Sequence, residues 1–244
     1  MDEINLSGWD FSELTASGRM RESGLPWDYH KIVKEKMSGI LRLLDMGTGG
    51  GEFLKTLAPL PQETYATEGY EPNVKIAASN LKPYGVKVIT GYKNEALPFE
   101  DNLFDLVINR HEYYVPSEVK RILMPGGFFI TQQVKWDVDK EIIELLGRKP
   151  EEAAAEYYGW SIETAERDLL ETGFEIIVSK EAEGNTFFAD TAALISYIKV
   201  INWLIPDFTL QKYEHELKKA EQIISQNGNF KSTLNRFLIL AKKL

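Results

Sequence analysis

The stretch from Leu43 to Glu52 contains the residue types and spacing in this chain that are best suited to chemistry. It reads LLDMGTGGGE, which predicts an apolar strand that ends in an acid, then a turn through glycines and the start of a helix. Alternating glycines allow backbone N–H groups to come close to a ligand that side chains would otherwise block. The N–H groups at the start of the following helix point to the same place. The sequence therefore predicts a nucleotide-type pocket formed by Asp45, Gly47, Thr48, Gly49 and Gly51.

The spacing of these glycines favours one class of nucleotide. Dinucleotide-binding loops follow the pattern G-x-G-x-x-G, whereas this loop reads G-x-G-x-G and has Glu52 where the last glycine would stand. A carboxylate at that position would repel a pyrophosphate. Asp45 suits a ligand that carries an ammonium and a sulfonium, as S-adenosyl-L-methionine does. We therefore expect S-adenosyl-L-methionine as the cofactor, and the alternatives are a nicotinamide dinucleotide or a glycine-rich turn without a ligand.

Composition excludes several classes of protein. The 244 residues include no cysteine, which rules out disulfides, thiolate chemistry and cysteine-ligated zinc. The three histidines are scattered, so we expect no metal site based on histidine. The net charge is −9 and no lysine or arginine cluster exceeds a pair, which argues against nucleic acid as a partner. The chain starts with acidic residues and has no apolar run of about 18 residues, so we expect a cytoplasmic protein without a membrane segment.

Strand and helix patterns alternate from residue 40 onward. This alternation predicts an α/β fold in which helices connect the strands of a parallel sheet. The expected strands cover 40–45, 64–68, 86–90, 104–109, 128–134 and 174–179, with a last strand near 235–241. The segment 187–232 precedes that last strand and carries helical patterns near 191–204 and 209–225. Such an insertion is the natural candidate for a lid or a substrate-binding element.

Polar residues at the carboxyl ends of the strands are candidate cofactor contacts, because ligands of doubly wound sheets bind beyond those ends. Glu68 ends the second strand, and its carboxylate could accept hydrogen bonds from both hydroxyls of a ribose. Glu71 is the alternative, although its place directly before Pro72 suits a helix cap better. Asn94 and Glu95 follow the third strand and could meet an adenine edge, or they could be solvated loop residues.

A second set of candidates follows the buried fourth strand, where the reacting group of the cofactor should lie. Asn109 is a candidate for cofactor binding, and Arg110 is a candidate for binding the acceptor. His111 could remove a proton from a nucleophilic acceptor, because an imidazole titrates near working pH. The alternative is that Arg110 and His111 make structural hydrogen bonds. Gln132 of the fifth strand reaches the same edge of the sheet and could orient the acceptor.

Aromatic residues stand out in two further segments. The first 38 residues are rich in them and include Trp27 and Tyr29. These two side chains could contact an acceptor if the segment closes over the cofactor, or they could simply pack the segment onto the domain. Trp203 in the insertion allows the same two interpretations, as a substrate contact or as part of a hydrophobic core.

Together these residues resemble the class I S-adenosyl-L-methionine-dependent methyltransferases of the methyltransferase-11 type. The resemblance rests on the glycine loop, on Leu97-Pro98-Phe99 followed by Phe104–Val107, and on the L-x-P-G-G turn at Leu123–Gly127. It implies a Rossmann-like, doubly wound α/β sheet of seven strands in the order 3-2-1-4-5-7-6, with the last strand antiparallel. It also implies that Asp45 and the loop glycines flank the methionine part of the cofactor and that Glu68 flanks its ribose.

The resemblance covers residues 40–135 and includes two departures from the family pattern. The segment Glu68-Gly69-Tyr70-Glu71-Pro72 is one residue out of the usual register, and Lys93 or Asn94 stands where the adenine loop usually has an aspartate. The flanking segments look like an uncharacterised bacterial subgroup of the family. We therefore expect an N-terminal arm or lid over 1–38 and a methyltransferase domain over 39–244, with the insertion 187–232 inside it.

The function implied by the resemblance is methyl transfer to a small-molecule acceptor by direct in-line displacement. An RNA-base methyltransferase and a non-catalytic S-adenosyl-L-methionine-binding module are the alternatives, and an NAD-dependent oxidoreductase is a third. The sequence names neither the acceptor atom nor the oligomeric state.

Overall fold

The computed structural model describes residues 11–153, 155, 158–201 and 203–244. These residues divide into two compact units. Unit 1 takes the described residues of Met1–Leu25, Val134–Trp160 and Ala182–Arg236. Unit 2 takes Pro26–Gln133, Ser161–Glu181 and Phe237–Leu244. Residues 1–10 of the expected N-terminal arm lie outside the described residues.

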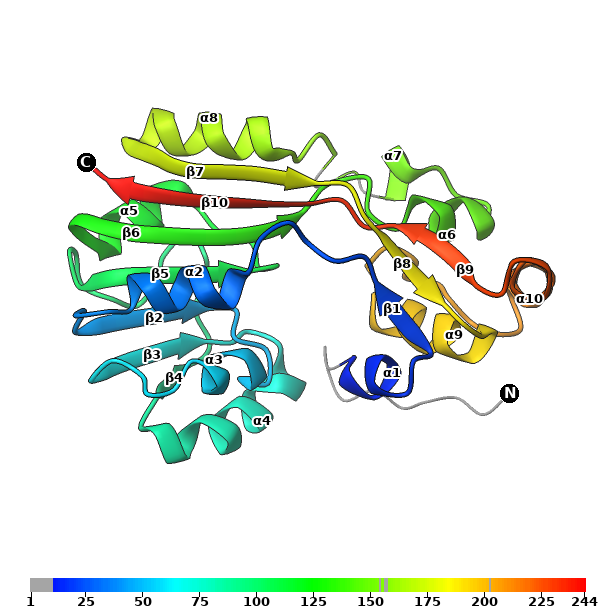
Figure 1. Ribbon diagram of the computed structural model, residues 1–244, viewed down its shortest axis with the longest axis horizontal. Helices are drawn as coiled ribbons and strands as arrows, with labels where there is room; N and C mark the ends of the chain where they lie inside the picture. The colour runs from blue at the N-terminus through cyan, green and yellow to red at the C-terminus, as the bar shows by residue number, and fades with distance from the viewer. Residues whose placement is uncertain (1–10, 154, 156–157, 202) are drawn as a thin grey trace. The chain divides into compact units, whose positions relative to one another are not determined.

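Unit 2 is built on a sheet of seven strands (Figure 1). The strands are β2 (Arg42–Met46), β3 (Glu63–Thr67), β4 (Lys87–Ile89), β5 (Phe104–Arg110), β6 (Leu123–Val134), β7 (Phe174–Ala182) and β10 (Arg236–Lys243). Their order in the sheet is β4-β3-β2-β5-β6-β10-β7, which is 3-2-1-4-5-7-6 when the strands are numbered within this sheet. The first five strands pair in parallel and β10 runs antiparallel, so the predicted topology is confirmed.

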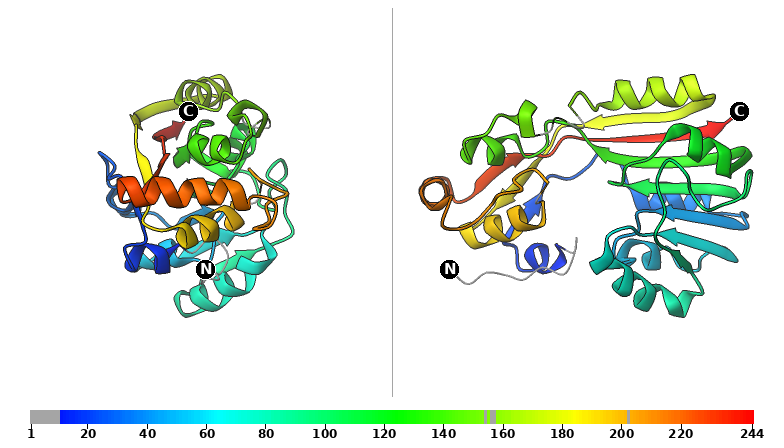
Figure 2. Two further views of the ribbon diagram at one scale, coloured as in Figure 1. Left: turned by 90° about the vertical axis from the view of Figure 1, so that its right-hand side faces the viewer. Right: turned by 180° about the vertical axis from the view of Figure 1, so that it is seen from behind.

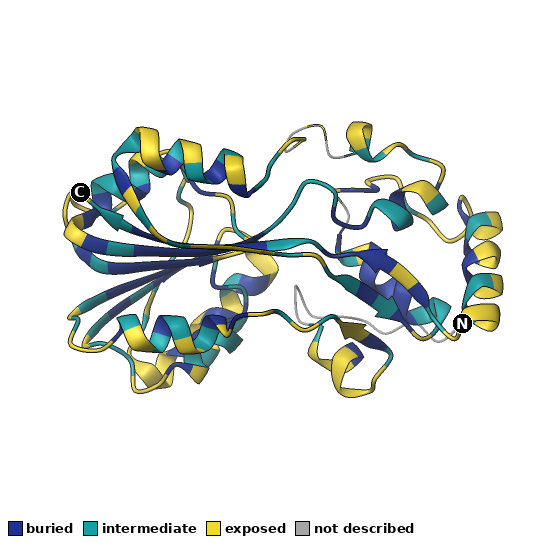
Figure 3. Cartoon of the chain, turned by 45° about the horizontal axis from the view of Figure 1, so that its top comes forward, coloured by how far each residue is buried: buried dark blue, intermediate teal, exposed yellow. Residues whose placement is uncertain are grey.

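The middle of each central strand is apolar because both faces of the sheet are covered. Leu43 and Leu44 in β2 and Val107 in β5 have no exposed surface. In Figure 3 the strands of this sheet are mostly dark blue, and helices with exposed outer faces lie on both sides of it. Continuous apolar runs are typical of parallel strands buried in this way, which is why they could be read from the sequence.

The helices of unit 2 are short, and local signals mark several of their ends. They are α2 (Tyr29–Lys36), α3 (Glu52–Thr56), α4 (Glu71–Leu81), α5 (Pro116–Ile122) and α8 (Ile162–Thr172), with a 3₁₀ turn at Lys82–Tyr84. Asp28 caps α2 by accepting a hydrogen bond of 2.9 Å from the Lys31 N–H. Gly173 ends α8 with a φ of 94°, a conformation that favours glycine.

The register of the parallel strands aligns their carboxyl ends. Met46 at the end of β2 pairs with Thr67 of β3 on one side and with Asn109 of β5 on the other. Asn109 in turn pairs with Thr131 of β6. The segments that follow these strands therefore start from one edge of the sheet, where a ligand of a doubly wound sheet binds.

Unit 1 contains a second, antiparallel sheet of three short strands in the order β1-β8-β9 (Figure 2). The strands are β1 (Met20–Glu22), β8 (Asn185–Phe188) and β9 (Phe230–Thr233), and the helices are α1 (Ser12–Ala16), α6 (Lys140–Leu145), α7 (Pro150–Ala153), α9 (Thr191–Val200) and α10 (Glu214–Asn227). Helices α9 and α10 lie in the expected helical insertion. The three strands were not anticipated, because each is only three or four residues long and gives little alternation to recognise.

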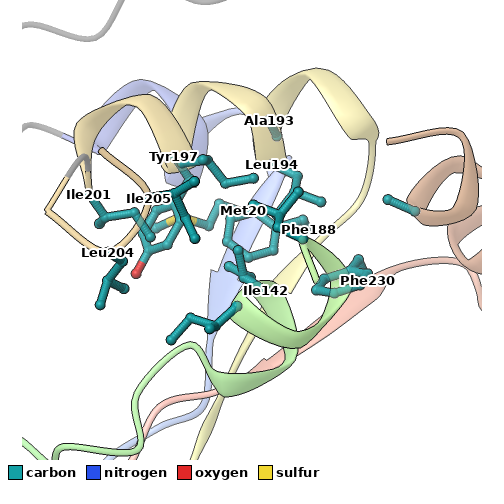
Figure 4. Packing of buried hydrophobic residues seen from close by; sticks show 14 of the residues in the cluster. Met20, Ile142, Phe188, Ala193, Leu194, Tyr197, Ile201, Leu204, Ile205 and Phe230 are labelled. Atoms are coloured by element: carbon teal, nitrogen blue, oxygen red, sulfur yellow. The ribbon is translucent and has the colours of Figure 1, made fainter. Parts of the chain in front are cut away.

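The hydrophobic core of unit 1 lies between this sheet and α9 (Figure 4). Met20, Phe188 and Phe230 are register partners across the three strands and point the same way. Tyr197 of α9 packs on this row, with its ring centroid 5.0 Å from that of Phe188. None of the helices in the described part of the chain is long and apolar enough to cross a membrane.

Candidate functional site

The glycine loop follows β2 and is fixed to the end of β3. Gly47 and Gly49 have φ values of 67° and 62°, in the left-handed region that favours glycine. The Thr48 N–H donates a hydrogen bond of 2.9 Å to the Thr67 carbonyl, and the Gly47 N–H donates one of 3.2 Å to the Thr67 hydroxyl. Gly51 follows with a φ of 81° and directly precedes α3. The predicted turn from strand to helix is present.

Asp45 is a buried acid directly before this loop. Its side chain is 4% exposed and accepts a hydrogen bond of 2.7 Å from the Thr48 hydroxyl. Burial raises the pKa of Asp45 to about 6, and the charge of Glu68 adds to the increase. The Thr48 hydroxyl and the charge of Arg110 act in the opposite direction. The protein groups around Asp45 therefore stabilise its ionised form only in part.

Glu68 is joined to the glycine loop. Its carboxylate is 6% exposed and accepts a hydrogen bond of 2.7 Å from the Tyr70 N–H. Gly49 and Gly69 also donate backbone N–H groups to it, although burial still raises its pKa. Glu71, the alternative ribose contact, is the first residue of α4. The structure thus brings together the two parts of the predicted pocket, the loop and the acid after the second strand.

The loop after β4 contributes Tyr92 and Asn94 to the same region. A Cβ atom on Gly69 would lie 3.7 Å from the Tyr92 hydroxyl, and burial raises the pKa of Tyr92 to about 12. The Asn94 amide nitrogen donates a hydrogen bond of 3.1 Å to Glu112, while its oxygen is buried without a partner among the described residues. Glu95, the other predicted adenine contact, is exposed. Tyr92 was not identified from the sequence as a site residue.

Glu112, which the sequence analysis also missed, lies directly on the glycine loop. A Cβ atom on Gly47 would be 2.5 Å from the Glu112 Cγ and 2.9 Å from its Oε2. Burial raises the pKa of Glu112, and the charge of Glu68 raises it further. The only signal in the sequence was its place in the polar run that follows the fourth strand.

A network of amides fixes the backbone of Glu112. Asn109 has no exposed surface, and its Nδ2 donates a hydrogen bond of 3.1 Å to the Glu112 carbonyl. Its Oδ1 accepts hydrogen bonds from Thr131 at 2.8 Å and from Gln133 at 2.5 Å. Gln133 also donates to the Glu112 carbonyl, at 3.0 Å. Both ends of the Asn109 amide are therefore occupied by protein groups.

Three residues predicted for the acceptor side form one chain of contacts. The Trp27 indole N–H donates a hydrogen bond of 2.8 Å to Oε1 of Gln132, and Nε2 of Gln132 lies 3.4 Å from Nε2 of His111. An indole nitrogen only donates, so Trp27 fixes which end of the Gln132 amide faces His111. The NH₂ group of Gln132 then donates, and Nε2 of His111 accepts. His111 is exposed, with a φ of 63°, and its backbone N–H donates to the Gln132 carbonyl at 2.9 Å.

Tyr29 lies close to Asn109, and Arg110 lies close to Asp45. The Tyr29 hydroxyl is buried and donates a hydrogen bond of 3.1 Å to the Asn109 carbonyl. The Arg110 guanidinium lies 4.6 Å from the centroid of the Phe53 ring and close enough to Asp45 to lower its pKa. Trp203 belongs to unit 1, where it is 42% exposed, and its role in acceptor binding stays a prediction.

The residues present fit S-adenosyl-L-methionine. Asp45 and Glu112 offer carboxylates to positive charge, and Glu68 offers one to ribose hydroxyls. Gly49 has open space where a side chain would stand, so the loop can accept a close ligand. In the described ranges, no three histidine, aspartate or glutamate side chains are grouped so that they could hold a metal ion. The site is thus suited to a cationic organic ligand.

Comparison with known proteins shows what this part of the chain is similar to. Residues 44–131 match the family model of a methyltransferase domain. A ubiquinone biosynthesis O-methyltransferase of Roseobacter denitrificans is 25% identical over 115 residues, which are 44% of this chain and 46% of that protein. The uncharacterized methyltransferase YcgJ of Bacillus subtilis is 29% identical over 98 residues, which are 36% and 39% of the two chains. The chain therefore spans about half the length, or less, of these curated relatives.

Two solved structures share the fold of the chain. The protein BH2331 of Bacillus halodurans has a TM-score of 0.61 at 17% identity, and the match covers 88% of this chain and 98% of that one. The YcgJ protein has a TM-score of 0.57 at 18% identity, with 88% and 97% covered. The matched family model includes the glycine loop, Glu68 and the residues after β5. Residues 44–131 are therefore similar to the methyltransferase domain of class I S-adenosylmethionine-dependent methyltransferases.

Proposed function

We propose that this protein transfers a methyl group from S-adenosyl-L-methionine to a small-molecule acceptor. The observation that carries the proposal is the joining of Asp45, the glycine loop and Glu68 at one edge of the sheet, within the residues that match the methyltransferase domain. When bound, S-adenosyl-L-methionine would supply an electrophilic methyl group on a sulfonium. The acceptor nucleophile would bond to this methyl carbon in line as its bond to sulfur breaks, and S-adenosylhomocysteine would leave as a neutral thioether.

We assign each cofactor contact by matching the hydrogen-bonding group of a side chain to a group of the cofactor. Asp45 would accept hydrogen bonds from the ammonium group, and Glu68 would accept them from the ribose hydroxyls. Asn94 has a buried oxygen without a partner among the described residues, which suits a donor such as an adenine amino group. Asn109 would act through Glu112 and not by direct contact, because both ends of its amide are occupied.

The acceptor would bind beside His111, Gln132 and Arg110, with Trp27 holding Gln132 in its orientation. His111 would receive the acceptor proton once its imidazole turns from Gln132. Tyr29 stabilises the end of β5 through its hydrogen bond to the Asn109 carbonyl. Positioning two reactants in near-attack geometry can lower a barrier by roughly 7–11 kcal/mol, so the reaction does not depend on a strong acid–base pair.

Two observations support a small molecule over RNA as the acceptor. The chain carries a net charge of −9, and its lysines and arginines form no cluster larger than a pair. The Roseobacter relative is named for ubiquinone biosynthesis, a small-molecule pathway. We also propose that the segment 1–38 and the insertion 187–232, including Trp203, serve acceptor recognition, since the matched family model spans only residues 44–131.

Calorimetric titration with S-adenosylhomocysteine tests the cofactor assignment, with NADH as the control. We expect micromolar binding of S-adenosylhomocysteine and no binding of NADH. Binding of NADH alone would make the protein an oxidoreductase, and binding of neither would refute the assignment. Release of S-adenosylhomocysteine from S-adenosyl-L-methionine is then measured over a panel of phenols, amines, acids and RNA. Turnover with RNA alone would overturn the small-molecule acceptor, and binding without any turnover would favour a non-catalytic module.

A further inference from the structure

The side chain of Glu112 occupies the space in front of the first loop glycine. Its Oε2 would be 2.9 Å from a Cβ atom on Gly47, and its Cγ would be 2.5 Å away. Because Gly47 lacks a side chain, Glu112 is the group that contacts this face of the loop. A cofactor that approaches the loop must therefore meet the carboxylate of Glu112.

Glu112 is held firmly, and by neutral groups. Its carbonyl accepts hydrogen bonds from the amides of Asn109 and Gln133, at 3.1 and 3.0 Å. Its carboxylate accepts a hydrogen bond of 3.1 Å from Asn94. All three donors are carboxamides, which hold Glu112 in place without neutralising its carboxylate.

The charges near Glu112 favour the binding of a cation beside its carboxylate. The charge of Glu68, a second acid, raises the pKa of Glu112. Arg110 acts on Asp45 and not on Glu112. Among the ion pairs formed by the described residues, none includes Glu112. A positively charged ligand would therefore stabilise this carboxylate more than a neutral one would.

The two forms of the cofactor differ in charge at the sulfur. S-adenosyl-L-methionine carries a sulfonium, whereas S-adenosylhomocysteine, the product, has an uncharged thioether. We propose that Glu112 is a specificity-determining residue that makes the pocket favour the cationic methyl donor over its neutral product. The proposal rests on the proposed function and adds that this carboxylate helps the product to leave.

The test is calorimetric titration of the unaltered protein and of Glu112→Gln with both cofactor forms. Glutamine keeps the size and the hydrogen bond with Asn94 but removes the charge. We expect the dissociation constant for S-adenosyl-L-methionine to rise about tenfold in Glu112→Gln, and that for S-adenosylhomocysteine to change less than about twofold. The analogue in which a protonated amine replaces the sulfonium should behave like the methyl donor.

Two controls separate charge from structure. Glu100→Gln removes one exposed carboxylate from the chain and should leave both dissociation constants unchanged. Glu112→Asp keeps the charge and should retain part of the preference for the methyl donor. If Glu112→Gln loses affinity equally for both cofactor forms, or loses affinity for neither, the proposal is overturned. If neither form binds the unaltered protein, the proposed function itself fails, which is a different result.

Discussion

Trp27 and Gln132 lie 105 residues apart in the sequence, and a buried hydrogen bond of 2.8 Å joins the indole N–H of one to the side-chain oxygen of the other. This contact attaches the segment before α2 to the end of β6. It also sets the orientation of the Gln132 amide, and through it the nitrogen of His111 that accepts a hydrogen bond.

Trp27→Phe should lower the free energy of unfolding by about 1–3 kcal/mol, because the buried oxygen of Gln132 loses its donor. Urea denaturation of Trp27→Phe, Gln132→Leu and the double variant measures the effect as a cycle. We expect the double variant to lose less stability than the sum of the two single variants, by about 1 kcal/mol. Additive losses would show that the two side chains do not depend on each other.

Gly47→Ala should destabilise the protein more than the same change at Gly49 does. The added Cβ would meet Glu112 at Cγ and Oε2, at 2.5 and 2.9 Å, and would also force alanine into a left-handed conformation. Gly49→Ala is the matched control for stability, because its φ is similar but nothing lies within 4 Å of the new Cβ. Backbone strain of this kind costs about 1–3 kcal/mol, so thermal melting should show a loss in both variants and a larger one for Gly47→Ala. Equal losses would contradict the contact with Glu112.

Cofactor affinity should rise with pH between about 5 and 7. The pKa of Asp45 is about 6 before the ligand binds, and a cation favours the ionised form, so binding near pH 6 should release protons. Glu68 and Glu112 also have raised pKa values and add to the release. Titration calorimetry in two buffers of different ionisation enthalpy counts these protons. Asp45→Asn should reduce the count, and affinity that is independent of pH would refute this role.

His111→Asn should lower kcat about 100-fold for an acceptor that must lose a proton, which is the lower range for a general base. Asparagine tolerates the left-handed conformation of this position, where φ is 63°, so the variant removes the imidazole with little strain. Affinity for S-adenosylhomocysteine should stay the same. Unchanged turnover would remove His111 as the base.

Unit 1 should lose stability as the pH rises from about 4 to 7. Asp139 is 2% exposed, and burial raises its pKa to about 7, helped by the charges of Glu141 and Glu22 and opposed by hydrogen bonds from Tyr197 and Ser232. An acid whose pKa is higher in the folded state holds its proton there, so the stability it contributes is full at low pH and falls as the pH approaches the folded-state value. Thermal melting from pH 5 to 8 should show a decline that Asp139→Asn flattens. Parallel curves for the two proteins would refute this assignment.

Much of the fold of unit 2 could be predicted because its signals are local. The buried strand at 104–109 corresponds to β5, and the helix start expected at Glu71 and Pro72 is the start of α4. Apolar runs, a proline near the start of a helix and a glycine at its end act over a few residues, so they survive in the sequence. The short strands of unit 1 could not be predicted, because β1 is stabilised by pairing with β8, far along the chain.

The sequence by itself determined the glycine loop, the acids before and after it and the resemblance of this segment to a methyltransferase domain, since these depend on neighbouring residues and on backbone conformations that glycine favours. Only the tertiary structure decided that Glu112 covers Gly47, that Asn109 hydrogen-bonds the Glu112 carbonyl, and that Trp27 orients Gln132. Such contacts join residues from different strands and loops. They arise from the register of β2, β5 and β6 in the sheet, which no local pattern of residues records.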